Sequence, residues 1–244
     1  KATRVRSLRQ RWIVNSVVPI FLLLIPATIY FGLRFSGRAY YVTSTLVMIE
    51  TLVPFLLAFE NRKPQARELV VLAVMCALAV AGRVAIPIPS FKAIFGIIMI
   101  AGIAFGPESG FLVGAISALA SNFFYSQGPY TPWQMMAYGA GGMLAGFVFA
   151  EGRLPRKPVV MGIFGFLAVA FFVGPLLDTC SVFLVKNVSF KGAMMFYVYG
   201  FPVNLRQAVA TAIVLLVLGK PLLEKLDRIK TKYGILDDEG GKET

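Results

Sequence analysis

The chain contains 244 residues, 57% of them hydrophobic and 15% charged, with a formal net charge of +12 and no histidine. This composition excludes an ordinary soluble domain, in which about a quarter of the residues are charged. The absence of histidine removes the commonest general base and metal ligand, so catalysis and metal binding that depend on histidine are excluded as well.

Eight apolar segments follow one another along the chain. A membrane helix needs about 20 apolar residues to cross roughly 30 Å of hydrocarbon, and helices satisfy their own backbone polar groups in lipid. We therefore predict an all-α, polytopic membrane helical bundle with crossings at 12–33, 40–59, 68–86, 93–105, 110–126, 132–150, 158–185 and 193–218. The 93–105 segment is short for a full crossing, so a tilted, broken or only partly inserted helix is the alternative there.

Basic residues set the expected orientation. Most of the 24 lysines and arginines precede the first crossing, join the second to the third and the sixth to the seventh, or follow the last. Because cytoplasmic loops carry the excess of positive charge, we predict that both termini are cytoplasmic. Nucleic-acid binding also uses basic residues, but their position at helix ends favours anionic lipid headgroups. We expect a lipid bilayer and no nucleic acid among the partners.

The charged and glycine-rich segments divide the chain. We predict an N-terminal pair of transmembrane helices at 1–59, in which Glu50 has no evident partner, and a cytoplasmic linker at 60–67. A six-helix membrane core rich in glycine and alanine follows at 68–232. The polar tail at 233–244 is typical of a disordered segment.

Enzyme motifs are missing, whereas faces of small residues recur. The chain has no Walker A loop, GxSxG elbow or paired-acid signature, so any ATP hydrolysis is expected in another polypeptide. Ala73, Ala77 and Ala81 share one helical face, and Gly110/Gly114 and Gly142/Gly146 form GxxxG pairs. Such faces either pack the chain's own helices closely or dock another membrane subunit.

Polar and aromatic residues gather in three loops on the predicted outer side and at a few positions inside the last two segments. Tyrosine and tryptophan at such positions form either an interfacial belt or the mouth of a binding site. Asp178 and Arg206 are close enough in depth to pair, either as a structural ion pair or around a ligand. The candidate substrate-binding residues are Arg83, Phe91, Lys92, Asn122, Tyr125, Gln127, Tyr130, Trp133, Tyr138, Asp178, Tyr197, Asn204 and Arg206.

The ordered set of motifs from 68 to 232 resembles the substrate-binding S component of an energy-coupling factor (ECF) vitamin transporter. The resemblance rests on the alanine-spaced helix, the loop Ile86–Lys92, the segment Ala101–Gly114 and the aromatic turn before a glycine-rich helix. It implies a six-helix core with both termini inside, a transmembrane coupling (T) protein and two cytoplasmic ATPases. It also implies that the Ala73/Ala77/Ala81 face meets the coupling protein, and that the outer loops close over a vitamin. The helices predicted in 1–59 depart from this pattern.

The resemblance implies a non-catalytic subunit of an ABC-type importer in the bacterial cytoplasmic membrane, with no cofactor or metal of its own. The size of the chain and its broad aromatic loops are closest to the cobalamin-specific type, so cobalamin is the favoured ligand. A pyridoxine-like compound, pantothenate, folate or a thiamine precursor is the alternative, and aromatics with amides also suit a flavin or pteridine. A membrane enzyme and a stand-alone scaffolding protein are the readings outside transport.

Overall fold

The computed structural model describes residues 66–128, 130–184 and 189–234, together with the single positions Thr28, Leu46 and Glu50. The predicted crossings at 12–33 and 40–59, and nearly all of the linker and tail, lie outside the described residues. Among the isolated positions, the Thr28 hydroxyl donates a hydrogen bond of 2.7 Å to the Glu50 carboxylate. Glu50 therefore has a partner that the sequence did not reveal.

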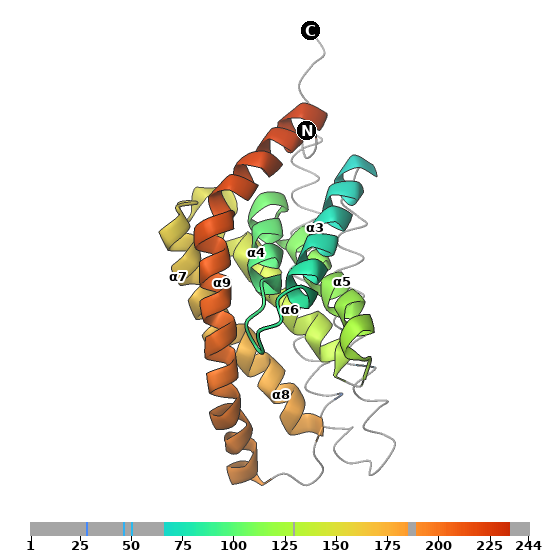
Figure 1. The fold of residues 1–244 in the computed structure, drawn as a ribbon, viewed down its shortest axis with the longest axis vertical. Coiled ribbons are helices and arrows are strands. Elements are labelled where there is room, and N and C mark those ends of the chain that lie inside the picture. Colours follow the sequence, from blue (N-terminus) through green and yellow to red (C-terminus); the bar gives the residue numbers. More distant parts are fainter. Residues whose placement is uncertain are drawn as a thin grey trace.

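All regular structure in the described residues is helical, and six helices form the core predicted for 68–232 (Figure 1). Helices α7 (Pro158–Ala168) and α8 (Gly174–Leu184) continue one another through a π-helical turn, η2 (Val169–Val173), and count as one helix. The bounds are α3 Ala66–Val84, α4 Ile94–Phe105, α5 Pro107–Tyr125, α6 Thr131–Phe149, η1 Ala150–Gly152, α7 Pro158–Ala168, η2 Val169–Val173, α8 Gly174–Leu184 and α9 Phe190–Tyr233.

Two stretches of the described residues are long and apolar enough to cross a membrane, judged by length and composition alone. They are Pro158–Val182 and Phe190–Tyr233, and Ile94–Phe105 is a shorter apolar helix. The helical membrane architecture agrees with the prediction in this coarse sense. The number of crossings and the orientation stay predictions.

The short helix α4 is the centre of the core. All of its residues are buried, and it packs against α3, α5, α6, α7 and α9. Its 12 residues span about 18 Å at 1.5 Å per residue, which is well short of the hydrocarbon thickness. Neighbouring helices surround α4, so its apolar sequence reflects burial in protein.

Glycines bring α5 and α6 into backbone contact. A Cβ atom on Gly110 would lie 2.5 Å from the Gly142 carbonyl oxygen, and one on Gly114 would lie 2.5 Å from the Tyr138 carbonyl carbon. The turn between α4 and α5 also needs glycine, because Gly106 has a φ of 97° before Pro107 begins α5. The two GxxxG faces therefore pack the chain's own helices.

Helix α9 runs further than the predicted segment 193–218. It continues to Tyr233 through Pro202 and Pro221, and its C-cap is Gly234 in the left-handed conformation. Leu223 and Leu226 are buried in the extension, so an apolar stripe packs this part of the helix onto the core beyond the point where charged residues begin.

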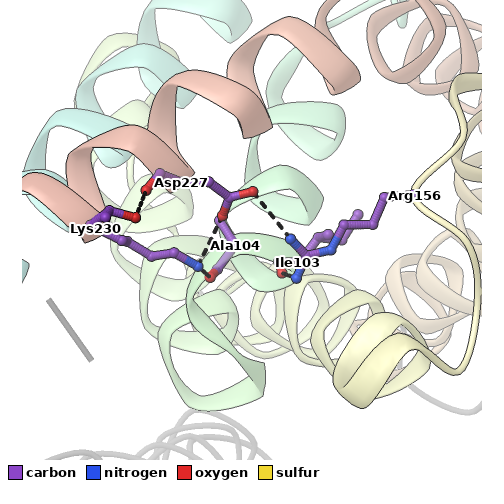
Figure 2. Close-up of polar contacts among 6 residues, drawn as sticks. Ile103, Ala104, Arg156, Asp227 and Lys230 are labelled. Carbon is purple, nitrogen blue, oxygen red and sulfur yellow. Dashed lines mark hydrogen bonds and ion pairs between the residues drawn. The ribbon is translucent and has the colours of Figure 1, made fainter. Parts of the chain in front are cut away.

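Basic side chains hold the C-terminal end of α4, at the end of the bundle that is predicted to be cytoplasmic (Figure 2). Lys230 Nζ donates to the Ala104 carbonyl at 2.6 Å, and an Arg156 Nη atom donates to the Ile103 carbonyl at 3.2 Å. Asp227 accepts from both cations, at 3.1 Å from Lys230 and 3.4 Å from Arg156. Carbonyls at a helix C-terminus lack intrahelical partners and carry partial negative charge, which the two cations satisfy.

Candidate ligand-binding site

A cavity of about 510 Å³ opens at the end of the bundle opposite this cluster of basic residues. Its floor is the first turn of α4, one wall is built from the α3–α4 loop with α5 and α6, and the other from α8 and α9. The lining residues are Arg83, Ser90, Lys92, Ile94, Phe95, Tyr125, Tyr130, Gln134, Tyr138, Leu177, Asp178, Cys180, Ser181, Val203 and Gln207.

Arg83 is held in a fixed position at the end of α3. Its Nη1 atom donates to the Asn122 Oδ1 atom at 2.9 Å and to the Ser121 hydroxyl. The guanidinium carbon also lies 4.9 Å from the ring centroid of Tyr125 and 5.6 Å from that of Tyr138. Cations over aromatic faces within about 6 Å are attracted to the ring, so Arg83 is preorganised in the cavity wall.

The α3–α4 loop carries the second cation of the cavity. Lys92 donates to the Ile86 carbonyl across the loop, and its Nζ atom lies 5.9 Å from the Tyr125 ring centroid. Ser90 has a φ of 58°, a left-handed conformation that is uncommon for a residue with a side chain. The Ala93 amide donates to the Gly82 carbonyl at 3.1 Å, which ties the end of the loop back to α3.

A network of amide side chains links the C-terminal end of α5 to the start of α6. Asn122 Nδ2 donates to the Thr131 hydroxyl at 3.0 Å and to Gln134 Oε1 at 2.8 Å. Thr131 in turn donates to Gln127 Oε1 at 3.0 Å. Asn122 thus links Arg83 to Gln134, and both of these residues line the cavity.

The opposite wall contains the acidic residue of the cavity. Asn204 Nδ2 donates to Asp178 Oδ2 at 2.7 Å. Each of these two side chains packs against a glycine of the facing helix. A Cβ on Gly174 would lie 2.7 Å from Asn204 Nδ2, and one on Gly200 would lie 2.6 Å from Asp178 Oδ2. Each glycine of one helix therefore makes room for the polar residue of the other.

The cavity brings together six of the residues predicted from the sequence, Arg83, Lys92, Tyr125, Tyr130, Tyr138 and Asp178. Two more support lining residues, since Asn122 holds Arg83 and Asn204 holds Asp178. The remaining candidates do not line it. Phe91 lies in the α3–α4 loop, Gln127 lies in the α5–α6 loop, and Trp133 is buried in the first turn of α6. Tyr197 shares a 2.9 Å hydrogen bond with the Thr179 hydroxyl, and Arg206 is exposed on α9.

The partner of Asp178 is therefore Asn204, and the geometrically possible ion pair with Arg206 is not what the structure forms. Helix phase explains the difference. Asn204 is buried, while Arg206, two positions further along α9, is exposed. Residues two apart on a helix do not share a face.

Several lining residues were not among the predicted ones. Ile94, Phe95, Leu177 and Val203 are apolar, so nothing in the sequence marks them as lining residues. Gln207 did carry a signal, because a polar side chain in an apolar helix is costly in lipid and faces the interior or a cavity.

The alanine face of α3 lies on the outside of the described core. Ala73, Ala77 and Ala81 are exposed, whereas the opposite side of α3 buries Leu72 and Met75 in the core.

A family model described as ECF-type riboflavin transporter, S component, matches residues 63–224. The chain belongs to this family. Its members are membrane-embedded, substrate-binding subunits of vitamin transporters and work with a T component and ATPases. The S-component prediction is thereby confirmed, and the cobalamin-specific type is not, because the family description names riboflavin. Comparisons with curated proteins and with solved structures give no match.

Proposed function

We propose that this S component binds riboflavin in the cavity above α4 and delivers it inward together with a T component and two ATPases. The observation that carries the proposal is the cavity itself, through its size and its aromatic, basic and amide lining. The family description supplies the name of the vitamin.

The size of the cavity favours a flavin over a corrinoid. Pockets that enclose drug-sized ligands measure roughly 300–1,000 Å³, and 510 Å³ lies in the lower part of this range. Riboflavin is a molecule of this class, whereas cobalamin has more than three times as many non-hydrogen atoms. Cobalamin, the ligand favoured from the sequence, would need a substantially wider site.

The lining also suits the two chemical parts of riboflavin. Phe95 and Tyr138 pack edge to face, with ring centroids 4.6 Å apart, and Tyr125 and Tyr130 add two more rings to the cavity. Aromatic surfaces of this kind stack on or pack against a flat ring system such as isoalloxazine. Arg83 and Lys92 offer donors to carbonyl and hydroxyl oxygens, the groups in which riboflavin is rich.

The exposed alanine face is the proposed contact with the T component. Small residues at intervals of four let a second helix approach the backbone closely in lipid. The face lies on α3, and the same helix ends in the cavity at Arg83, two residues beyond Ala81. Because Arg83 and the alanine face lie on the same helix, a movement of the cavity wall at Arg83 would also move the docking face.

A titration of the purified full chain in detergent tests the ligand. Riboflavin fluorescence should be quenched saturably at one ligand per chain, because the bound ring lies among aromatic side chains. Cobalamin, folate, pantothenate, pyridoxine or thiamine, added at a concentration equal to that of riboflavin, should not displace it and restore the fluorescence. The proposal is wrong if riboflavin is not bound, or if one of these vitamins displaces it at equal concentration.

A further inference from the structure

Gln207 has an unused hydrogen-bonding atom in the cavity wall. Its Oε1 atom is buried and has no hydrogen-bond partner among the residues that the structure describes, and the residue lines the cavity. A buried polar group without a partner costs free energy, so rotation of this amide toward a ligand in the adjoining cavity would recover a hydrogen bond. Exchanging the amide oxygen and nitrogen would leave an unused donor in place of the acceptor.

The position of Gln207 places this amide at the bottom of the cavity. One turn further along α9, the helix meets α4 closely, since a Cβ on Gly96 would lie 2.8 Å from Val214 Cβ and 3.5 Å from the Thr211 carbonyl oxygen. Gln207 thus lies just above the α4–α9 contact that closes the floor. A ligand group that reaches it has entered the cavity fully.

We infer that Gln207 is a specificity-determining residue that reads the imide edge of the flavin ring, with Oε1 accepting from N3–H and Nε2 donating to an adjacent carbonyl. The inference rests on the proposed riboflavin function. A carboxamide and an imide edge each present one donor beside one acceptor in a plane, so two parallel hydrogen bonds form. Arg83 and Lys92, on the other wall, are donors only and cannot accept a hydrogen bond from N3–H. Asp178 and Gln134 also line the cavity, but they already accept from Asn204 and Asn122.

The arrangement predicts discrimination at a single atom of the ligand. Methylation of N3 removes the N–H group from which Gln207 would accept a hydrogen bond, and it adds bulk at the floor of the cavity. A site built to bond an N–H group rejects the analogue that lacks it, because its own polar atom is left unpaired. Riboflavin should therefore bind at least about tenfold more tightly than 3-methylriboflavin.

The test compares riboflavin and 3-methylriboflavin on the full chain and on the variants Gln207→Met and Gln207→Glu. The methionine variant keeps the length of the side chain but loses both polar atoms. It should weaken riboflavin binding about ten- to hundredfold and bring the two ligands within about threefold of each other. The glutamate variant should retain the preference, because a carboxylate still accepts from N3–H.

Thr211→Val is the matched control on α9. The Thr211 hydroxyl donates at 2.8 Å to the Gln207 backbone carbonyl and lies outside the cavity lining, so this change should leave both affinities as they are. Lumichrome, which has the ring but no ribityl chain, separates the two parts of the ligand and should lose affinity in Gln207→Met as riboflavin does.

Two results would overturn the inference. One is an unchanged preference for riboflavin over 3-methylriboflavin in Gln207→Met. The other is a loss confined to riboflavin with lumichrome unaffected, which would assign Gln207 to the ribityl hydroxyls. Failure of the wild-type chain to bind either flavin would instead refute the proposed function.

Discussion

Replacing Gly114 with alanine tests whether the close crossing of α5 and α6 shapes the cavity. The new Cβ would lie 2.5 Å from the Tyr138 carbonyl carbon and 2.6 Å from the Gly139 nitrogen. Both atoms belong to backbone, so no side-chain rotation relieves the contact, and the helices would have to separate by roughly 1 Å.

The expected cost follows from two opposing contributions. Overpacking of a dense core costs about 1–3 kcal/mol, and this contact lies at the upper end because three backbone atoms are involved. Alanine in place of glycine in a helix returns about 1 kcal/mol. The free energy of unfolding should therefore fall by about 2 kcal/mol, which corresponds to about 4–8 °C in Tm for a chain of this size.

The same variant should weaken ligand binding, because the displaced backbone belongs to Tyr138, whose ring lines the cavity. Thermal denaturation in detergent with and without riboflavin measures both effects. Gly219→Ala is the control, since its Cβ would meet the flexible end of Met161 at 2.9 Å and should be neutral or slightly stabilising. If Gly114→Ala matched Gly219→Ala in Tm and in affinity, the close α5–α6 crossing would be refuted.

Three further predictions concern other parts of the molecule. Arg83→Met removes the donor that the Asn122 and Ser121 contacts preorganise, and should weaken riboflavin binding about tenfold or more by fluorescence titration, while an unchanged Kd would remove Arg83 from the site. Ala77→Trp should leave riboflavin binding intact but abolish copurification with the T component and ATPases, and recovery of the whole complex would exclude the alanine face as the docking surface. Lys230→Met leaves the Ala104 carbonyl without its donor and should lower the free energy of unfolding by about 1–2 kcal/mol in thermal denaturation, with the exposed Lys220→Met as control; equal Tm values for the two would show that the contact adds no stability.

The sequence was sufficient for the helical class, for the S-component family and for six of the residues that line the cavity. Continuous apolar runs, basic residues at helix ends and the motif order each carried part of that information. The burial of α4 inside the bundle was harder to predict from the sequence, because an apolar segment has the same composition whether lipid or protein surrounds it. Its length of 12 residues was the clue to burial within the bundle.

Helix phase limited the prediction of the site. The alanine face and the GxxxG faces consist of the same kind of residue, yet the first is exposed and the second is packed inside. Arg206 and Gln207 are neighbours in the chain, but Gln207 lines the cavity while Arg206 is exposed. Which side of a helix faces the interior depends on its packing partners, and these are set by contacts far apart in the sequence.

Native mass spectrometry of the full chain, extracted from cells grown with a mixture of vitamins, tests most directly whether the cavity above α4 holds riboflavin. We expect a bound mass of one riboflavin per chain in the wild type and a marked loss of that mass in Arg83→Met. A bound cobalamin or another vitamin in its place, or retention of riboflavin in the variant to the same extent as in the wild type, would contradict it.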